Sequence, residues 1–265
     1  MLDAGGVRRA LARARPSAVY HCAGAPHAGQ SWQTAAATLE VNVLATHHLF
    51  EAVRALGTPV PVLVPGSALV YQPSLSALDE EAAIGPNNPY ATSKLAQEQL
   101  SLHVARDEGL PVFVTRSFPH IGPRQDPSFA AASFARQVAR IEAGLDEPVI
   151  HVGNLEAERD LLDVRDVVRA YVALVARGRP GRVYNVCAGR AYRVAEVLDR
   201  LLALAGVRVG IQQDADRMRP SDTPRVLGDA GRIREEVGWL PEIPLDRTLA
   251  DLLAYWREQL RLGKR

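Results

Sequence analysis

The sequence predicts an α/β fold in which helices cover both faces of a parallel sheet. Short runs rich in Val, Ile and Leu alternate with longer amphipathic stretches along the first 125 residues. These runs are almost continuously apolar, which is typical of parallel strands that are buried on both faces. Alternation of such strands with helices indicates the α/β class.

The elements of the first half can be assigned in order. "SAVYHCAG" predicts a strand at 17–24, and an amphipathic helix is expected over 31–56. "PVPVLVPGS" predicts a strand at 59–67, followed by a polar loop and a helix over 89–108. "LPVFVTRSF" predicts the next strand at 110–118. Each strand is bounded by polar, Gly or Pro residues, as strands in open sheets are.

Beyond residue 125 short strands and helices are mixed, and we expect a second lobe laid over the first. The expected helices cover 127–143, 164–176, 193–205, 229–237 and 244–262. The expected strands are "PVIHVG", "RDLLDV", "GRVYNV" at 181–186 and "VRVGI". We predict that the strand at 181–186 returns to the sheet of the first lobe.

Composition excludes several classes of function. The net charge is +1, so nothing favours nucleic acid or an anionic membrane surface as a partner. No apolar run approaches the ~20 residues of a membrane span, and the N-terminus has no signal-peptide core. Cys22 and Cys187 lie in apolar stretches, which indicates buried thiols in a reducing, cytoplasmic compartment. The histidines show no ligand spacing, so we expect no metal site.

Tyr90 and Lys94 lie four residues apart near the start of the helix predicted over 89–108. This spacing puts both side chains on one helix face. The chain's only lysines are Lys94 and Lys264, so its basic residues are otherwise arginines. A lysine beside a tyrosine can lower the tyrosine pKa and make the phenol a general acid or base. Spacing alone nevertheless favours an ordinary surface lysine.

Ser67 adds a third group, because it ends the strand predicted at 59–67. Ligands of open parallel sheets bind beyond the carboxyl ends of the strands. A hydroxyl, a phenol and an ammonium are therefore expected in one crevice, an arrangement suited to hydride transfer at a C–O centre. A serine hydrolase is not supported, because "PGSAL" does not match G-x-S-x-G.

Ser67 with Tyr90-x-x-x-Lys94 resembles the catalytic trio of the extended short-chain dehydrogenase/reductases, the NAD-dependent epimerase/dehydratase family. Matching stretches follow in the family's order across the whole chain: "VYHCAG", "LEVNVLATHHLFEA", "RSFPHIGPRQ", "HVGNLEAERDLLDVRDVVRAY", "GRVYNVCAG" and "MRPSDTP". The segment "EAGLDEPVIHVGNLEAERDLLDVRDVVRAY" is most similar to the GDP-mannose branch, which contains 4,6-dehydratases and 4-keto reductases.

The resemblance implies a partial dinucleotide-binding domain at 1–125 and a nucleotide-sugar lobe at 126–265. It implies that Tyr90 is the general acid, that Ser67 orients the carbonyl, and that Lys94 lowers the Tyr90 pKa and holds the ribose. It also implies a homodimer formed through the helices at 31–56 and 89–108. The implied contacts with NADP or NAD are Ala23, Tyr90, Lys94 and His120. The implied contacts with a GDP-linked sugar are Ser67, Asn154, Arg159, Arg219, Pro220, Ser221 and Asp222.

The two residues that follow Ser67 distinguish the dehydratases from the 4-keto reductases. The dehydratases resemble S-T-x-E at this point, and their acid takes part in eliminating water. Here Ala68 and Leu69 follow Ser67, and neither can move a proton. The resemblance therefore implies a 4-keto reductase, while a dehydratase or an epimerase of the same family remains an alternative.

Two departures from the family are visible. Pro119 stands where the family pattern Phe-Asn-His has an Asn that helps to hold the substrate. The chain also has no G-x-x-G-x-x-G loop, whose glycines let a pyrophosphate approach a helix N-terminus. We therefore expect a truncated member that lacks the first three strands, about 60 residues at ~30 or more per βαβ unit. Such a chain should bind NAD(P) poorly, and a non-catalytic nucleotide-sugar binder is the second alternative.

Overall fold

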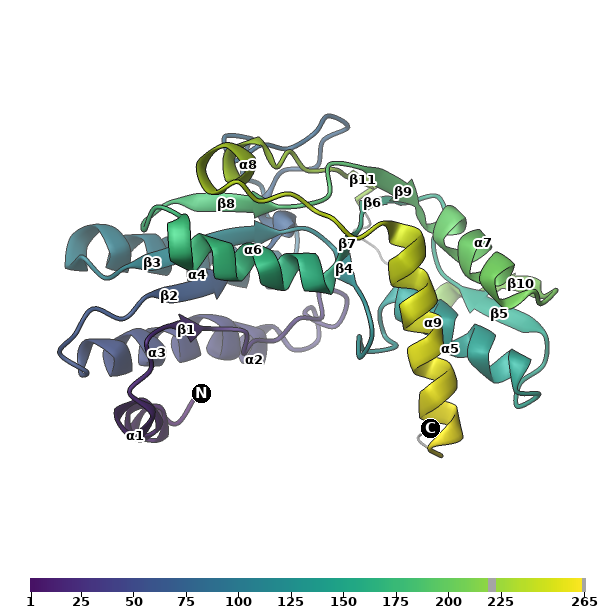
Figure 1. Ribbon diagram of the computed structural model, residues 1–265, viewed down its shortest axis with the longest axis horizontal. Helices are drawn as coiled ribbons and strands as arrows, with labels where there is room; N and C mark the ends of the chain where they lie inside the picture. The colour runs from purple at the N-terminus through teal and green to yellow at the C-terminus, as the bar shows by residue number, and fades with distance from the viewer. Residues whose placement is uncertain (219–222, 264–265) are drawn as a thin grey trace.

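The computed structural model describes residues 1–218 and 223–263, and its fold is α/β, as the sequence predicts (Figure 1). Four parallel strands form the main sheet in the order β1-β2-β3-β8. They are β1 (Val19–Tyr20), β2 (Val62–Pro65), β3 (Val112–Ser117) and β8 (Val183–Val186). The strand predicted at 17–24 is thus much shorter than expected, because the segment after residue 21 leaves the sheet.

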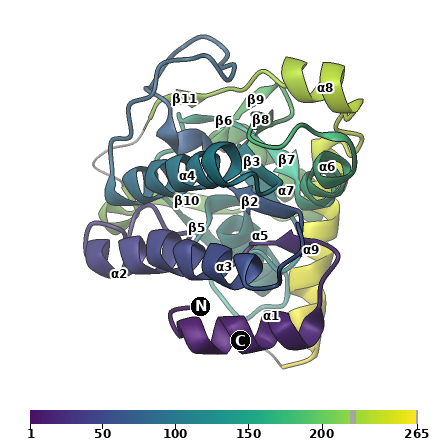
Figure 2. The ribbon, with the colours of Figure 1, turned by 90° about the vertical axis from the view of Figure 1, so that its left-hand side faces the viewer.

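Helices cover both faces of this sheet, and the side chains of β2 alternate between them. Val62 and Val64 pack with α3 (Ala45–Arg54) and α4 (Pro89–Glu108). Leu63 packs on the opposite face with α6 (Val164–Arg177) and α8 (Gly231–Val237). Figure 2 shows α3 and α4 on one side of the sheet and α6 on the other. This period of two is the geometry of a strand buried on both faces.

Two features of the first 60 residues were not predicted. An N-terminal helix, α1 (Ala4–Ala14), is capped by Asp3 and packs Val7 and Leu11 against the core under α3. The helix predicted over 31–56 begins at Ala35 and consists of α2 (Ala35–Leu39), a π-helical turn η1 (Glu40–Leu44) and α3. A π-helical turn inside an α-helix is rare and often lies at a functional site.

The second core lies at the other end of the molecule (Figure 1). It packs α5 (Ala130–Glu142), α7 (Val194–Ala205) and α9 (Leu245–Arg261) around β5 (Val149–Val152), which pairs in parallel with β10 (Gly210–Gln213). The remaining short elements are η2 (Ala68–Val70), β4 (His120–Ile121), β6 (Glu158–Asp160), β7 (Leu162–Asp163), β9 (Ala191–Arg193), η3 (Ala215–Arg217) and β11 (Arg225–Val226).

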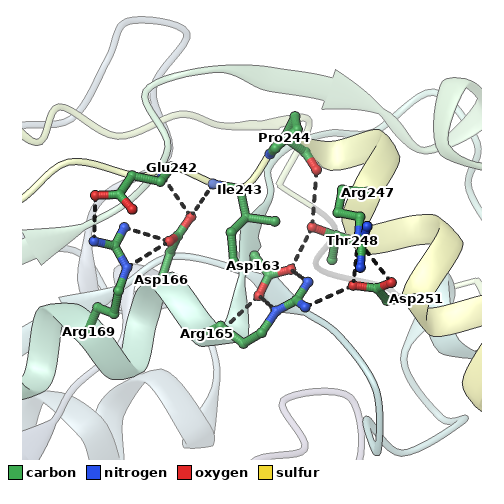
Figure 3. Close-up of polar contacts among 10 residues, drawn as sticks. All are labelled: Asp163, Arg165, Asp166, Arg169, Glu242, Ile243, Pro244, Arg247, Thr248 and Asp251. Atoms are coloured by element: carbon green, nitrogen blue, oxygen red, sulfur yellow. Dashed lines mark hydrogen bonds and ion pairs between the residues drawn. The ribbon is translucent and has the colours of Figure 1, made fainter.

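Two buried carboxylates join the ends of the molecule (Figure 3). Asp163 caps the N-terminus of α6 and accepts a hydrogen bond from the Thr248 hydroxyl of α9 at 2.7 Å. Asp166, in the first turn of α6, accepts from the backbone N–H groups of Glu242 and Ile243 at 3.0 and 2.9 Å. The helix that covers the main sheet, α6, is therefore anchored to the segment that leads into α9.

Among the described residues, no helix is long and apolar enough to cross a membrane.

Candidate active site

Ser67 lies at the carboxyl end of β2, where the strand passes close to its neighbour. A Cβ at Gly66 would lie 2.2 Å from the carbonyl oxygen of Thr115, so only glycine allows this approach. Ser67 is the N-cap of η2, and its Oγ accepts a hydrogen bond from the backbone N–H of Leu69 at 3.2 Å. Because Leu69 N–H is itself the donor, the Ser67 hydroxyl keeps its own hydrogen for another partner, and Tyr90 is one such partner.

Tyr90 and Lys94 are presented by the first turns of α4. The side chain of Asn88 caps the helix by accepting from Ala91 N at 2.9 Å, and Pro89 occupies the first helical position. Both residue types are favoured at these positions, so the helix begins where the sequence predicts. Tyr90 and Lys94 consequently lie one turn apart on the face directed at the end of β2.

Burial raises the pKa of Tyr90, and its hydrogen bond with the Ser67 hydroxyl only partly opposes this shift. The direction is opposite to the lowering that we expected from Lys94. The physical reason is that the Tyr90 phenolate would be desolvated here, while the Lys94 ammonium is directed toward other acceptors. Tyr90 is therefore a protonated phenol at neutral pH, in contact with Ser67.

Lys94 is buried, and its ammonium donates to the carbonyl oxygen of Pro65 and to Gln97 Oε1, at 2.6 Å each. Burial lowers the pKa of Lys94 to about 8, and the nearby Cys22 thiol acts in the opposite direction. Pro65 is the last residue of β2. Lys94 is thus held beside the strand end that carries Ser67, and the structure brings the predicted trio together.

The two other residues expected at a cofactor lie on separate segments. Ala23 is exposed in the segment that follows β1. Asn42 anchors this segment to α4, because its Oδ1 accepts from Ala25 N at 2.8 Å and its Nδ2 donates to Ser93 Oγ at 2.9 Å.

His120 lies in β4, where Nδ1 donates to the carbonyl oxygen of Phe118 at 3.1 Å. Burial lowers the His120 pKa, so the ring is neutral with Nε2 as its free acceptor.

The residues expected at a nucleotide sugar lie in the second half of the chain. Asn154 Oδ1 accepts from the backbone N–H of Glu156 at 3.0 Å. The Arg159 guanidinium, in β6, donates from Nη1 to the carbonyl oxygen of Thr223 at 2.8 Å. The predicted residues Arg219, Pro220, Ser221 and Asp222 lie outside the described residues. Arg159 therefore contacts the chain immediately after that predicted segment.

Sequence reasoning missed three buried polar side chains behind Lys94. They are His21, Thr46 and Gln97, each at most 5% exposed. Gln97 lies three residues after Lys94, so helical spacing alone could have placed it beside the ammonium. Nothing in the sequence pattern links His21 or Thr46 to it. In the described part of the chain, no group of three or more His, Cys, Asp or Glu side chains could hold a metal ion.

Comparison with known proteins identifies the family of the chain. Residues 1–252 match the model of the family described as GDP-mannose 4,6 dehydratase. The chain is 40% identical over 249 residues to the GDP-6-deoxy-D-mannose reductase of Pseudomonas aeruginosa, covering 93% of this chain and 82% of that protein.

Two solved structures are similar over nearly the whole chain. RMD from Pseudomonas aeruginosa complexed with NADPH has a TM-score of 0.87 at 40% identity, covering 92% of this chain and 82% of that chain. MoeE5 in complex with UDP-glucose and NAD has a TM-score of 0.88 at 29% identity, covering 98% and 84%.

Proposed function

The chain belongs to the GDP-mannose 4,6-dehydratase family, and from this premise we propose that it reduces a nucleotide-linked 4-keto-6-deoxyhexose with a nicotinamide cofactor. The observation that carries the proposal is the convergence of Ser67, Tyr90 and Lys94 at the end of β2, with no acid in the two positions after Ser67. A GDP-linked sugar is favoured, because the relative that is 40% identical is a GDP-6-deoxy-D-mannose reductase.

The chemistry assigned to the chain's residues is proton transfer and orientation. Ser67 donates its hydroxyl hydrogen to the substrate carbonyl oxygen when substrate is bound and so directs that oxygen toward Tyr90. Tyr90 gives its proton to the oxygen as charge develops there, and its raised pKa keeps that proton in place until then. Lys94 holds a positive charge beside the strand end that carries Ser67. An alkoxide formed in this buried site is stabilised by these preoriented donors.

The residues of the candidate site are suited to binding the nicotinamide end of a cofactor. The Lys94 ammonium has three N–H groups, and two of them are used by Pro65 and Gln97. The third has no partner among the described residues and is available to a ribose hydroxyl. Ala23, Tyr90 and His120 would border the same end of the cofactor, which supplies the hydride when bound. The printed sequence offers no G-x-x-G-x-x-G loop for the pyrophosphate.

The nucleotide sugar is assigned to the second half of the chain. Asn154, Arg159 and the segment Arg219 to Asp222 are the proposed contacts. Arginine suits a diphosphate because its planar fork can donate two hydrogen bonds to phosphate oxygens. The contact of Arg159 with Thr223 supports a role in ordering the end of that segment.

An assay with isolated products tests this proposal. The protein is incubated with GDP-6-deoxy-4-keto-mannose and NADPH or NADH, and the sugar nucleotide is analysed by NMR. Reduction predicts a 4-hydroxy product with one reduced cofactor consumed for each sugar. A dehydratase would instead convert GDP-mannose into the keto sugar, and an epimerase would change stereochemistry without net consumption of cofactor.

A further candidate within the same family is a non-catalytic nucleotide-sugar binder. Titration with NADPH, followed by nicotinamide fluorescence, separates the two functions. Saturable binding supports the reductase. Binding of GDP-sugars without any binding of NADPH or NADH supports the binder and contradicts the reductase.

We also propose a homodimer formed through α2, η1 and α4. Leu39 and Leu44 are 42% and 44% exposed on the helix that packs beside α4. Large apolar side chains left exposed on one helix are compatible with an interface.

A further inference from the structure

A chain of polar side chains runs from Lys94 into the interior and takes no part in the proposed proton transfer. Gln97 Nε2 donates to Thr46 Oγ1 at 2.7 Å, and His21 Nε2 lies 2.9 Å from the same oxygen. The side chains come from α4, from α3 and from the residue after β1. Gln97, Thr46 and His21 are 1%, 0% and 5% exposed, so water does not compete for these hydrogen bonds.

The direction of every bond in this chain can be deduced. The Lys94 ammonium can only donate, so the oxygen of the Gln97 amide must face it and the amide nitrogen must face Thr46. The Thr46 hydroxyl donates its one hydrogen to the carbonyl oxygen of Asn42 at 2.7 Å. Thr46 Oγ1 is therefore an acceptor for both Gln97 and His21, which fixes the proton of His21 on Nε2.

This arrangement constrains the ammonium. One N–H is held by Pro65 of β2 and another by Gln97, at 2.6 Å each. With two of three tetrahedral directions fixed, the direction of the third N–H is fixed as well. Rotation of the Gln97 amide would place its NH₂ group against a positive charge, and Thr46 prevents this by accepting from that NH₂.

We propose that Gln97 is a positioning residue: it aims the free N–H of Lys94 at the cofactor ribose and favours the charged form of Lys94, and Thr46 holds it in that orientation. The role in aiming at a ribose rests on the proposed function. The hydrogen bond to the ammonium rests on geometry alone. A hydrogen bond to a charged group contributes enough that its loss should lower NADPH affinity about 10- to 100-fold.

The protonation of Lys94 supplies a readout that a merely structural role would not move. The titratable groups that interact electrostatically with Lys94 are Cys22 and His21 from the segment after β1, and Tyr90 lies one helical turn before Lys94 on α4. Burial lowers the pKa of His21 to about 4 and raises that of Tyr90. Cys22 is exposed, in contrast to the buried thiol that the sequence predicts, and partial desolvation raises its pKa. Lys94, whose pKa is lowered to about 8, therefore titrates between these groups.

The experiment measures this titration directly. Since Lys94 and Lys264 are the only lysines in the sequence, protein labelled with ¹³C-lysine gives two side-chain signals, which the variant Lys264→Arg assigns. Gln97→Met removes the acceptor and should lower the Lys94 pKa below its wild-type value. Gln97→Glu adds a negative charge at the same place and should raise it. The control is Gln99→Met, an exposed glutamine on the same helix, which should leave the titration unchanged.

Opposite shifts in the two Gln97 variants support the proposal, and wild-type titration in both folded variants overturns it. If Gln97→Met does not fold, Thr46→Val provides the second test, because it removes the anchor of the amide without touching Lys94. A lower Lys94 pKa in that variant supports the proposal, and an unchanged pKa contradicts it. If the wild-type protein reduces no keto sugar, the proposed function fails, whereas the lysine titration still decides the role of Gln97.

Discussion

Burial shifts the pKa values around the site in directions that depend on the charge of each group. It lowers the pKa of Lys94 to about 8 and that of His21 to about 4, and it raises that of Tyr90. In each case the neutral form gains, because a charge loses its hydration in the interior. The site in the free protein therefore combines a protonated phenol with an ammonium that titrates near physiological pH.

Acid should destabilise the protein through His21. Its folded-state pKa of about 4 lies below the ordinary value of 6.5, so the unfolded chain binds the extra proton. The stabilisation is complete above about pH 6.5 and is lost as the pH falls toward about 4, by about 3 kcal/mol in all. Urea unfolding of wild type and His21→Gln at pH 4.5 and 7 measures this change, because Gln retains a donor for Thr46.

Asp160 shifts stability in the opposite direction, so the wild-type profile alone does not isolate His21. Burial raises the pKa of Asp160 to about 6, even though three backbone N–H groups donate to its carboxylate. The folded state therefore binds a proton at Asp160 at a higher pH than the unfolded chain does. The contribution of Asp160 to the free energy of unfolding consequently falls as the pH rises from about 4 to about 6. A stability difference between wild type and His21→Gln that does not change with pH would contradict the assignment to His21.

Some residues of the candidate site can be predicted from the sequence, and others cannot. Ser67, Tyr90 and Lys94 carry local signals, namely the end of an apolar run and a four-residue spacing at a helix start. Gln97 depends on Thr46, which lies 51 residues earlier in the chain. A hydrogen bond between segments so far apart leaves no periodic pattern. The raised pKa of Tyr90 was also beyond reach, because it follows from burial in the folded state.

Local chemistry at the ends of α4 explains why its bounds were predicted correctly. Asn88 and Pro89 start the helix, and Gly109 ends it with a φ of 69° that favours glycine. The π-helical turn at Glu40–Leu44 has no such signal. The strands β4, β7, β9 and β11 are two or three residues long, which is too short for any periodicity. These elements exist because tertiary pairing stabilises them.

The anchor of α6 should contribute substantially to stability. Asp166 is fully buried and accepts hydrogen bonds from two backbone N–H groups and from Arg169 (Figure 3). Asp166→Ala leaves these donors unpaired, so we expect the free energy of unfolding to fall by about 3 kcal/mol. Urea unfolding at pH 7 measures this loss.

Arg169→Met is the matched control. The Arg169 side chain is 40% exposed, so solvent screens its ion pair and a loss below about 1 kcal/mol is expected. Equal losses in the two variants would show that the ion pair, and not the backbone contacts of Asp166, holds α6.

At the scale of the whole molecule, apolar packing is divided between the main sheet and the opposite end of the molecule. The two faces of the sheet carry separate clusters, and one of these includes α6, β8 and α8 from beyond residue 125. The cluster at the opposite end packs α5, α7 and α9. The alternation of apolar runs with amphipathic stretches in the sequence predicts the packing of helices around the main sheet. The joining contacts, such as those of Asp163 and Asp166, follow from packing between distant segments and were not predictable in detail.

If the protein is a homodimer as proposed, charges placed in the interface should halve the mass of the particle in solution. Replacing both Leu39 and Leu44 by Glu places two charges in the expected interface and should convert a dimer into a monomer, as measured by light scattering. Leu204→Glu on α7 is the control, because Leu204 is also 44% exposed but lies on a helix of the second core, away from α2, η1 and α4. A wild-type protein that is already monomeric, or a double variant that remains dimeric, would contradict the proposed interface.

The most direct test of the central claim is reduction of GDP-6-deoxy-4-keto-mannose by wild type and by Tyr90→Phe, followed through consumption of NADPH. The phenylalanine ring keeps the packing of the buried site and removes only the proton donor. The account predicts turnover by wild type and a fall of about 10²- to 10⁴-fold in kcat for Tyr90→Phe, with the fold intact by circular dichroism. Near wild-type turnover by Tyr90→Phe would show that another group gives the proton and would contradict the assigned mechanism.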